Sequence, residues 1–293
     1  MPGYVKTDEE VARIEAFLRP ARFMCDEIGI EFKTTWSFAR SVLPPIFEPT
    51  GDEVEGTCGG TVQITAFESA YCGPMDWGVV SLLCSYEGID GYWMLTEIVE
   101  PEFPVVIGRE LWGEVKKTGS ARFWRDGNYY RGVTERRGLT LLEIEAEIDG
   151  PEQGPFQSKG AGFDIKMFPH ANAHGLQYQP LLNIWDITLD YLSYREGSGT
   201  LRWGESEWDP TFTIPIHSVG TAYACQYAGY APLGQQIPLD DPENIYPRYL
   251  WGRAYDEPTR FPIAKRWQGV DEINDPPVSA EVAAAEPAAG GAY

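Results

Sequence analysis

The chain has 293 residues, of which 43% are hydrophobic and 13% aromatic, so it can build an extensive hydrophobic core and is not intrinsically disordered. Its 44 acidic and 23 basic residues give a formal net charge of −21 at pH 7. A protein that follows nucleic acid or docks on an anionic membrane needs a basic face, so we expect neither partner.

The sequence carries no recognisable targeting signal or membrane-spanning segment. Its N-terminal stretch is rich in charged residues, and no part of the chain approaches the ~18 consecutive apolar residues of a spanning helix. The five cysteines form no CxxC pair, which indicates neither a zinc ribbon nor a disulfide framework. We therefore expect a cytoplasmic protein with reduced thiols.

The best helical pattern lies near the N-terminus. In residues 7–24, apolar side chains recur every three to four positions behind an acidic first turn, and Pro20 is expected to end the helix. A second, short helix is predicted for residues 36–42, because Pro44 and Pro45 follow it.

From residue 61 onward the pattern changes to short β-type segments separated by Gly and Pro turns. Residues 125–128 have the composition of a hairpin turn. Many short strands without alternating helices predict an α+β protein that is mainly antiparallel β. The predicted strands cover residues 61–67, 77–86, 103–107, 122–124, 129–133, 139–148, 163–168, 181–194, 199–203 and 211–219.

No linker divides the chain, so we expect one domain over residues 1–270. Residues 233–267 are rich in Pro, Asp and Tyr and predict an irregular stretch. Residues 271–293 have low complexity and predict a flexible C-terminal tail.

Two of the seven lysines stand side by side, as Lys116 and Lys117, behind the apolar residues 103–107. Burial and a neighbouring cation both disfavour the ammonium form, so we expect the pKa of Lys116 to lie below its usual value. A neutral lysine is a nucleophile toward carbonyl carbon. For such a pair taken alone, a solvated turn with two surface lysines is the alternative interpretation.

The segment around this pair resembles the acetoacetate decarboxylase family. The resemblance is carried by Gly108-Arg109-Glu110, by the lysine pair and by Gly119, and it extends with gaps over about residues 23–229. It implies a closed, cone-like β-barrel with flanking helices, and a homo-oligomer. It also implies that Lys116 forms a Schiff base with a ketone and that Lys117 is the neighbouring cation, which is the established device of this family.

Three other positions depart from the family's pattern. Asp76 takes the place of one of two glutamates, Gln63 that of the other, and Cys25 that of an arginine suited to hold a substrate carboxylate. A glutamine cannot transfer a proton, and a missing arginine disfavours acetoacetate itself as substrate. The resemblance therefore implies Lys116, Lys117 and Asp76 as catalytic residues, with Gln63 and Cys25 contacting substrate.

Tryptophans stand close to these positions in the sequence. Trp77 follows Asp76, and Trp112 lies four residues before Lys116. Core packing is the usual role of tryptophan. The alternative is an apolar pocket around Lys116, in which Trp77 and Trp112 contact a bulky or aromatic ketone.

Other catalytic patterns are weak. His170 and His174 have a spacing that could hold a metal on a helix, but the segment is equally typical of a loop and lacks an acidic third ligand. We therefore expect no metal and no cofactor. The resulting hypothesis is a carbon–carbon lyase that uses a lysine Schiff base for β-keto acid decarboxylation or aldol-type cleavage or condensation. A non-catalytic barrel that binds a small ligand is the alternative.

Overall fold

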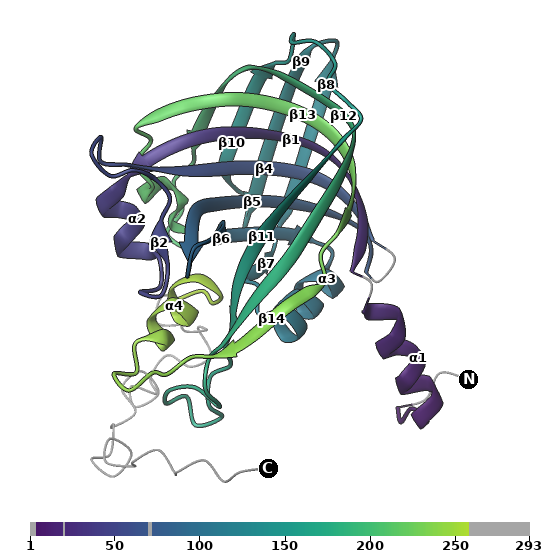
Figure 1. Cartoon of the computed structure of the whole chain (residues 1–293), viewed down its shortest axis with the longest axis vertical. Helices are drawn as coiled ribbons and strands as arrows, with labels where there is room; N and C mark the ends of the chain where they lie inside the picture. Colours follow the sequence, from purple (N-terminus) through teal and green to yellow (C-terminus); the bar gives the residue numbers. More distant parts are fainter. Residues whose placement is uncertain (1–3, 20, 70–71, 258–293) are drawn as a thin grey trace, which may run out of the picture. The chain divides into compact units, whose positions relative to one another are not determined.

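The computed structural model describes residues 4–19, 21–69 and 72–257 (Figure 1). By its internal contacts the chain divides into Met1–Asp256 and Glu257–Tyr293, and the description below concerns the first unit. Its helices are α1 (Asp8–Leu18), α2 (Trp36–Val42), α3 (Glu102–Ile107) and α4 (Tyr246–Arg253), with a π-helical turn η1 (Gly108–Trp112) and a 3-10 turn η2 (Pro210–Thr213).

The strands are β1 (Arg22–Thr35), β2 (Glu48–Pro49), β3 (Gly51–Asp52), β4 (Thr57–Ser69), β5 (Gly73–Tyr86), β6 (Ile89–Glu100), β7 (Lys116–Thr118), β8 (Ser120–Asp126), β9 (Tyr129–Arg136), β10 (Leu139–Glu147), β11 (Phe156–Lys166), β12 (Leu181–Trp203), β13 (Ser218–Tyr230) and β14 (Leu233–Pro238). The predicted class, mainly antiparallel β with a few helices, is confirmed.

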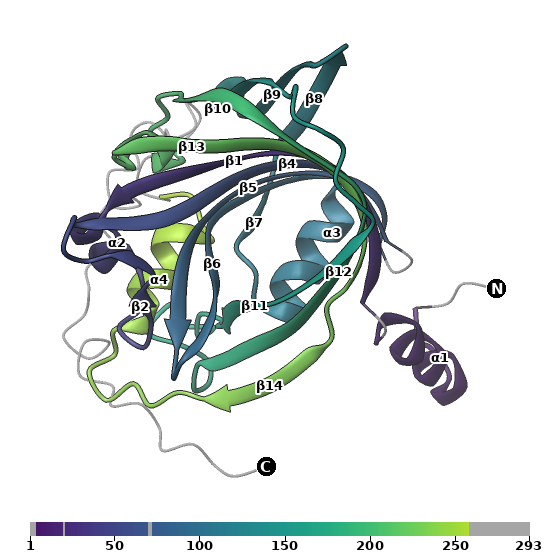
Figure 2. The same ribbon diagram turned by 45° about the horizontal axis from the view of Figure 1, so that its top comes forward.

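The strands form one sheet in the order β11-β6-β5-β4-β1-β13-β12-β10-β9-β8, and β11 also pairs with β12. The long strands curve strongly, as Figure 2 shows for β4, β5 and β12. Most pairs are antiparallel, but β6 runs parallel to β7 and to β11. The closed, cone-like barrel stays a prediction.

Several predicted elements are confirmed. Helix α2 has the predicted bounds, and β8 and β9 are joined by the predicted hairpin turn, where Gly127 adopts a positive φ of 61°. Thr35 caps α2 by accepting a hydrogen bond from the backbone N–H of Phe38.

The N-terminal helix is shorter than predicted. It ends at Leu18, and the remainder of the predicted range belongs partly to β1, which begins at Arg22. A helix does not readily continue into a proline, which the sequence has at position 20. Strand β1 pairs with two neighbours, β4 and β13, along nearly its whole length.

The apolar run at residues 103–107 is helical, not a strand. It lies in α3, within the connection between the parallel strands β6 and β7. Parallel neighbours need a crossover that returns the chain to the same end of the sheet, and a helix usually supplies it. The prediction of a strand here is wrong. The residues have a strand-like composition, but they form the helix that connects two parallel strands.

The C-terminal half differs in three further places. The predicted strands 181–194 and 199–203 are one continuous strand, β12, and most of 211–219 lies before β13 begins at Ser218. The stretch predicted to be irregular contains β14 and α4. In the N-terminal half, β6 had no predicted counterpart. The predicted boundary at 270 and the tail at 271–293 lie outside the described residues.

Buried apolar side chains form two clusters. The larger one fills the space between the strands and the helices α2 and α4. The smaller one borders the candidate site, and it consists of Cys25, Phe67, Met75, Val99, Val105, Cys225 and Tyr227. In the described part of the chain, no helix is both long and apolar enough to cross a membrane.

Candidate active site

A cavity of about 160 Å³ contains Lys116. Its walls come from β1, β4, β5, β6, β11, β12 and β13, together with η1 and the segment that leads from it into β7. Most lining side chains are apolar or aromatic, and the residues are Ala21, Phe23, Gln63, Phe67, Met75, Trp77, Val79, Tyr92, Met94, Trp112, Glu114, Lys116, Gly162, Asp164, Trp185, Ile187, Leu189, Tyr227 and Ala231.

Lys116 is the first residue of β7 and is only 2% exposed. Its Nζ lies 2.6 Å from Oε2 of Glu114. The ring centroids of Trp77 and Trp112 lie 5.4 and 5.6 Å from the same nitrogen. The amine thus lies close to two indole rings and one carboxylate. The indole rings favour its charged form through cation–π attraction.

Two glycines make room for this arrangement. A Cβ on Gly108 would overlap the Glu114 carboxylate and lie 2.6 Å from Cδ of Lys116, so the Gly108 backbone packs directly on the Lys116 side chain. Gly113 has a φ of +90°, and a Cβ there would meet the backbone of Lys166. A side chain at position 108 would therefore clash with Glu114 and Lys116, which explains why this position is glycine.

Three carboxyl groups lie near the amine, two of them fully buried and the third, Glu114, largely buried. Glu97, fully buried in β6, accepts hydrogen bonds from the indole of Trp77 and from the backbone N–H of Val115. Asp164, in β11, accepts one from the indole of Trp185 at 2.8 Å. Glu114 completes the group through its ion pair with Lys116.

Burial and the charge of Glu114 raise the pKa of two of these groups, Glu97 and Asp164. Burial raises the pKa of Glu97 well above its usual range, and the charge of Glu114 adds to this. Burial, again reinforced by Glu114, raises the pKa of Asp164 to about 7. Asp164 lines the cavity and can therefore exchange protons near neutral pH.

The pKa of Lys116 is raised, and the predicted lowering is wrong. Burial alone lowers this pKa, but attraction to Glu114 and Glu97 and the hydrogen bond to Glu114 outweigh it. Lys117 is not among the groups that set the value. The prediction failed because it considered the adjacent cation and missed the two carboxylates.

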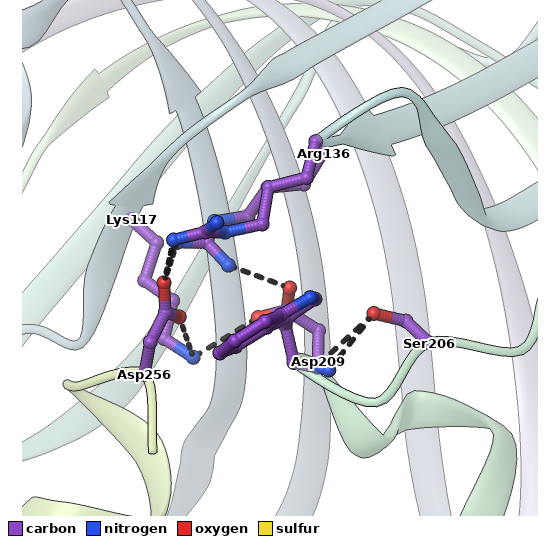
Figure 3. Close-up of polar contacts among 7 residues, drawn as sticks. Lys117, Arg136, Ser206, Asp209 and Asp256 are labelled. Atoms are coloured by element: carbon purple, nitrogen blue, oxygen red, sulfur yellow. Dashed lines mark hydrogen bonds and ion pairs between the residues drawn. The ribbon is translucent and has the colours of Figure 1, made fainter. Parts of the chain in front are cut away.

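Lys117 points to the opposite side of β7, as expected for consecutive residues of a strand. Its Nζ lies 3.0 Å from Asp209 and 3.7 Å from Asp256, and Arg136 binds both of these carboxylates at 2.8 and 2.9 Å (Figure 3). The backbone N–H of Asp209 donates to Ser206. The structure thus places Lys117 in a buried ion cluster and not in the Lys116 cavity.

Replacing Lys117 tests this assignment. We expect Lys117→Met to lower the free energy of unfolding by about 3 kcal/mol, because it leaves buried carboxylates partly unpaired. Lys33→Met is the matched control, since the ion pair of Lys33 with Glu55 is exposed and contributes below about 1 kcal/mol. Urea unfolding measures both. Equal losses in the two variants would contradict a structural role for Lys117.

Asp76 does not reach the cavity. It lies in β5 between Met75 and Trp77, which both line the cavity, so its own side chain points to the other face. There it adjoins Glu100 on the neighbouring strand. Burial moderately raises its pKa. The structure therefore separates Asp76 from Lys116.

From this position we expect Asp76 to contribute little to catalysis, contrary to the expectation from the sequence. We expect Asp76→Asn to change turnover by less than about threefold, in contrast to the 100-fold or larger loss typical of removing a general acid or base. Steady-state rates of the variant, measured beside Glu114→Gln, check this. A loss at Asp76 as large as that at Glu114 would restore the original assignment.

Gln63 lines the cavity, but its amide is already engaged. Its Nε2 donates to the buried Glu27 at 2.8 Å, and Glu27 also accepts hydrogen bonds from Thr65, Tyr223 and Tyr227. Burial raises the pKa of Glu27 despite these four donors. Gln63 is thus tied to a carboxyl group that lies behind the cavity wall.

Cys25 is buried in the smaller apolar cluster and is not among the lining residues. Burial raises the pKa of its thiol, so it carries no charge at neutral pH. Phe23, two residues earlier on the same face of β1, lines the cavity instead. Cys25 therefore supplies no charged contact for a substrate.

Sequence reasoning missed the acidic residues in and around the Lys116 cavity. Glu27, Glu97 and Asp164 each interrupt an apolar or alternating run, and an acidic residue at an inward position of a strand is the available signal. Glu114 lies two residues before Lys116. Strand spacing would have placed the two on one face.

The fold and this site define a class, a mainly β protein with a buried lysine in an apolar, carboxylate-containing cavity. The model of the acetoacetate decarboxylase family matches residues 10–237, and the chain belongs to this family. None of the curated proteins matches the chain.

Similar solved structures have the same fold at low sequence identity. An acetoacetate decarboxylase is 16% identical, with a TM-score of 0.66 over 76% of this chain and 91% of the other. The acetoacetate decarboxylase from Legionella pneumophila is 16% identical, with a TM-score of 0.64 over 74% and 87%. The enduracididine biosynthesis enzyme MppR, complexed with the condensation product of pyruvate and imidazole 4-carboxaldehyde, is 18% identical, with a TM-score of 0.63 over 76% and 90%.

Proposed function

We propose that this protein is a carbon–carbon lyase in which Lys116 forms a Schiff base with a carbonyl substrate. The reaction is the decarboxylation of a β-keto acid or an aldol-type cleavage or condensation. The observation that carries the proposal is the buried Lys116 amine in an apolar cavity, 2.6 Å from a carboxylate that can accept its proton. Membership of the acetoacetate decarboxylase family supports it.

The chemistry begins with proton transfer from Lys116 to Glu114, which frees the nitrogen lone pair. The amine adds to the carbonyl carbon, and the resulting carbinolamine takes up a proton and loses water to give an iminium ion. The site holds Asp164, whose pKa is raised to about 7 by burial and by Glu114, and this group can supply or remove protons in these steps.

The iminium then accepts the electron pair of the breaking carbon–carbon bond. In decarboxylation the bond to the carboxylate breaks, CO2 leaves, and an enamine remains. In aldol cleavage a carboxylate takes the proton of the β-hydroxyl group while an aldehyde leaves. Protonation of the enamine and hydrolysis of the imine release the product and restore Lys116, and condensation follows the same steps in reverse.

The cavity favours a substrate with an apolar or aromatic substituent. Its volume of about 160 Å³ is close to that of a cavity known to hold one benzene ring. Trp77, Trp112 and Trp185 supply aromatic walls. Within the described lining Lys116 is the only cation, so a substrate carboxylate finds no arginine there.

We therefore expect benzoylacetate to be a better substrate than acetoacetate, with a kcat/KM about 10- to 100-fold higher. Burying about 100 Å² of phenyl surface contributes about 2.5 kcal/mol, the upper end of this range. CO2 release from the two acids, measured side by side, gives the ratio. Rapid turnover of acetoacetate without gain from the aryl analogue would contradict this preference and indicate an ordinary acetoacetate decarboxylase.

The second candidate function is a non-catalytic protein that binds a small ligand. The observation in its favour is the ion pair with Glu114, because this pair raises the pKa of Lys116 and keeps the amine protonated. A ligand-binding protein need not form a covalent bond, whereas a Schiff-base enzyme must.

Borohydride trapping separates the two functions. Incubation with benzoylacetate or acetoacetone and borohydride is expected to add the mass of the reduced ligand to the peptide that contains Lys116. A sample without ketone is the control. Absence of the adduct, or an adduct confined to Lys6 or Lys265, would favour the binding protein.

We also propose, from family membership, that the strands close into a cone-like barrel, that the chains assemble into a homo-oligomer, and that the protein is cytoplasmic. Sedimentation velocity on the full chain tests the assembly. A single species with the mass of one 32.8 kDa chain would contradict it.

A further inference from the structure

A second cavity lies on the other side of the lysine pair. Its volume is about 370 Å³, and it shares no lining residue with the Lys116 cavity. Its walls come from α2, β6, β7, η2 and α4 and from the ends of the adjoining loops. The lining residues are Phe38, Ser41, Val42, Leu95, Thr96, Lys117, Asp209, Pro210, Thr211, Thr213, Ile214, Arg248, Tyr249, Gly252 and Arg253.

Positive charge gathers around this cavity although the chain has a net charge of −21. Lys117, Arg248 and Arg253 line it, against a single acidic residue, Asp209. Behind Asp209 lies Arg136 (Figure 3). Lys117 and Arg136 are both paired with Asp209 and Asp256, so the excess of positive charge comes from Arg248 and Arg253. Such a local excess of cations attracts an anion.

Arg253 has hydrogen-bonding capacity left over. Its Nη2 donates to the backbone carbonyl of Met94 at 2.6 Å, and its guanidinium lies 3.8 Å from the ring centroid of Trp93. Its Nε and Nη1 are buried and donate no hydrogen bond within the described residues. Buried donors of a charged group without an acceptor are costly, so this arginine is suited to receive one.

Within the part of the chain that the structure describes, no carboxylate supplies that acceptor. Burial lowers the pKa of Arg253 to about 10, and Asp164 and Glu97 oppose this through space without hydrogen bonding to it. Asp209 is engaged with Lys117 and Arg136. A ligand carboxylate would pair with this desolvated guanidinium through charge-assisted hydrogen bonds.

The rest of the lining indicates the body of the ligand. Phe38, Val42, Leu95, Ile214 and Tyr249 present apolar surface. Concave sites that combine such surface with a few placed polar groups are typical of small-molecule sites. We propose that this cavity binds a small organic acid, with its carboxylate at Arg253 and Arg248 and its apolar part against these side chains.

The test uses 4-fluorobenzoate and its neutral analogue 4-fluorobenzamide, observed by fluorine NMR with the full chain. We expect saturable binding of the acid below about 10 mM, at least about tenfold tighter than that of the amide. The Lys116→Gln variant is measured in parallel. Because it removes the cation of the Lys116 cavity, an acid that binds there would lose affinity, whereas one in the second cavity would not.

Two variants locate the site. Arg253→Gln removes the proposed anion partner, and Ser41→Trp places a large side chain at the exposed rim of α2, where the fold tolerates it. Each is expected to weaken binding of the acid at least about tenfold. If Arg253→Gln does not fold, Ser41→Trp decides alone. Absence of saturable binding, equal binding of the amide, or binding that survives Ser41→Trp but not Lys116→Gln would overturn the proposal.

Discussion

Lys116→Arg is expected to abolish borohydride trapping and to lower turnover by at least about 10³-fold. A guanidinium stays protonated at any working pH and offers no lone pair to a carbonyl carbon. The positive charge beside Glu114 is kept, so the main loss is that of the nucleophile. Mass spectrometry of the trapped protein and steady-state rates measure the two effects.

Lys159→Arg is the matched control because this lysine is exposed in β11 and lies outside the cavity. We expect it to keep both trapping and turnover. Urea unfolding of both variants checks that the fold is intact. If Lys116→Arg retained a trapped adduct on its remaining lysines together with normal turnover, the reaction would not pass through Lys116.

The sequence predicted the site best where close packing requires a particular residue type. Gly108 leaves room for Lys116, so the Gly108-Arg109-Glu110 motif and the lysine pair together pointed to the buried amine. Trp77 and Trp112, selected for their proximity in sequence, do line the cavity. These residues lie within or next to one short segment, where sequence distance is a useful guide to spatial distance.

Residues that depend on strand register were harder to predict. Consecutive residues of a strand point to opposite faces of the sheet, so Asp76 and its neighbour Trp77 lie on different faces. An error of one position in the predicted register therefore places a side chain on the wrong face. The same alternation separates Lys117 from Lys116. Asp209 and Asp256, the partners of Lys117, lie more than ninety residues away in the chain, so no local pattern could have indicated them.

The acidic residues Glu97 and Asp164 could not be assigned from composition alone. In a chain with 44 acidic residues, most are exposed, and burial distinguishes the few that matter. Their proximity to Lys116 arises from pairing of β6 with both β7 and β11, and parallel pairs bring together segments that no hairpin joins. This pairing also brings Glu97 close to Lys116, where it adds to the effect of Glu114 in raising the pKa of the lysine.

Glu114→Gln is expected to lower the turnover rate and to move the pH dependence of borohydride trapping to lower pH. Turnover should fall about 100-fold or more, since the amide cannot accept the proton of Lys116. Trapping, in contrast, should reach its maximum at lower pH than in the wild type. The pKa of Lys116 is raised mainly by Glu114, with a further contribution from Glu97, while burial lowers it.

The sign of this shift follows from the charge that is removed. Imine formation needs the neutral amine, so the rate of trapping rises as pH increases through the Lys116 pKa. Without the carboxylate at 2.6 Å, burial is opposed chiefly by Glu97, the pKa falls, and the rising limb moves to lower pH by about one unit or more. Trapping rates across the pH range, with Glu110→Gln as an exposed control on the same segment, measure the displacement. A limb that stays in place or moves to higher pH would mean that Glu114 does not hold the proton of Lys116, and the proposed first step would have to be assigned to another group.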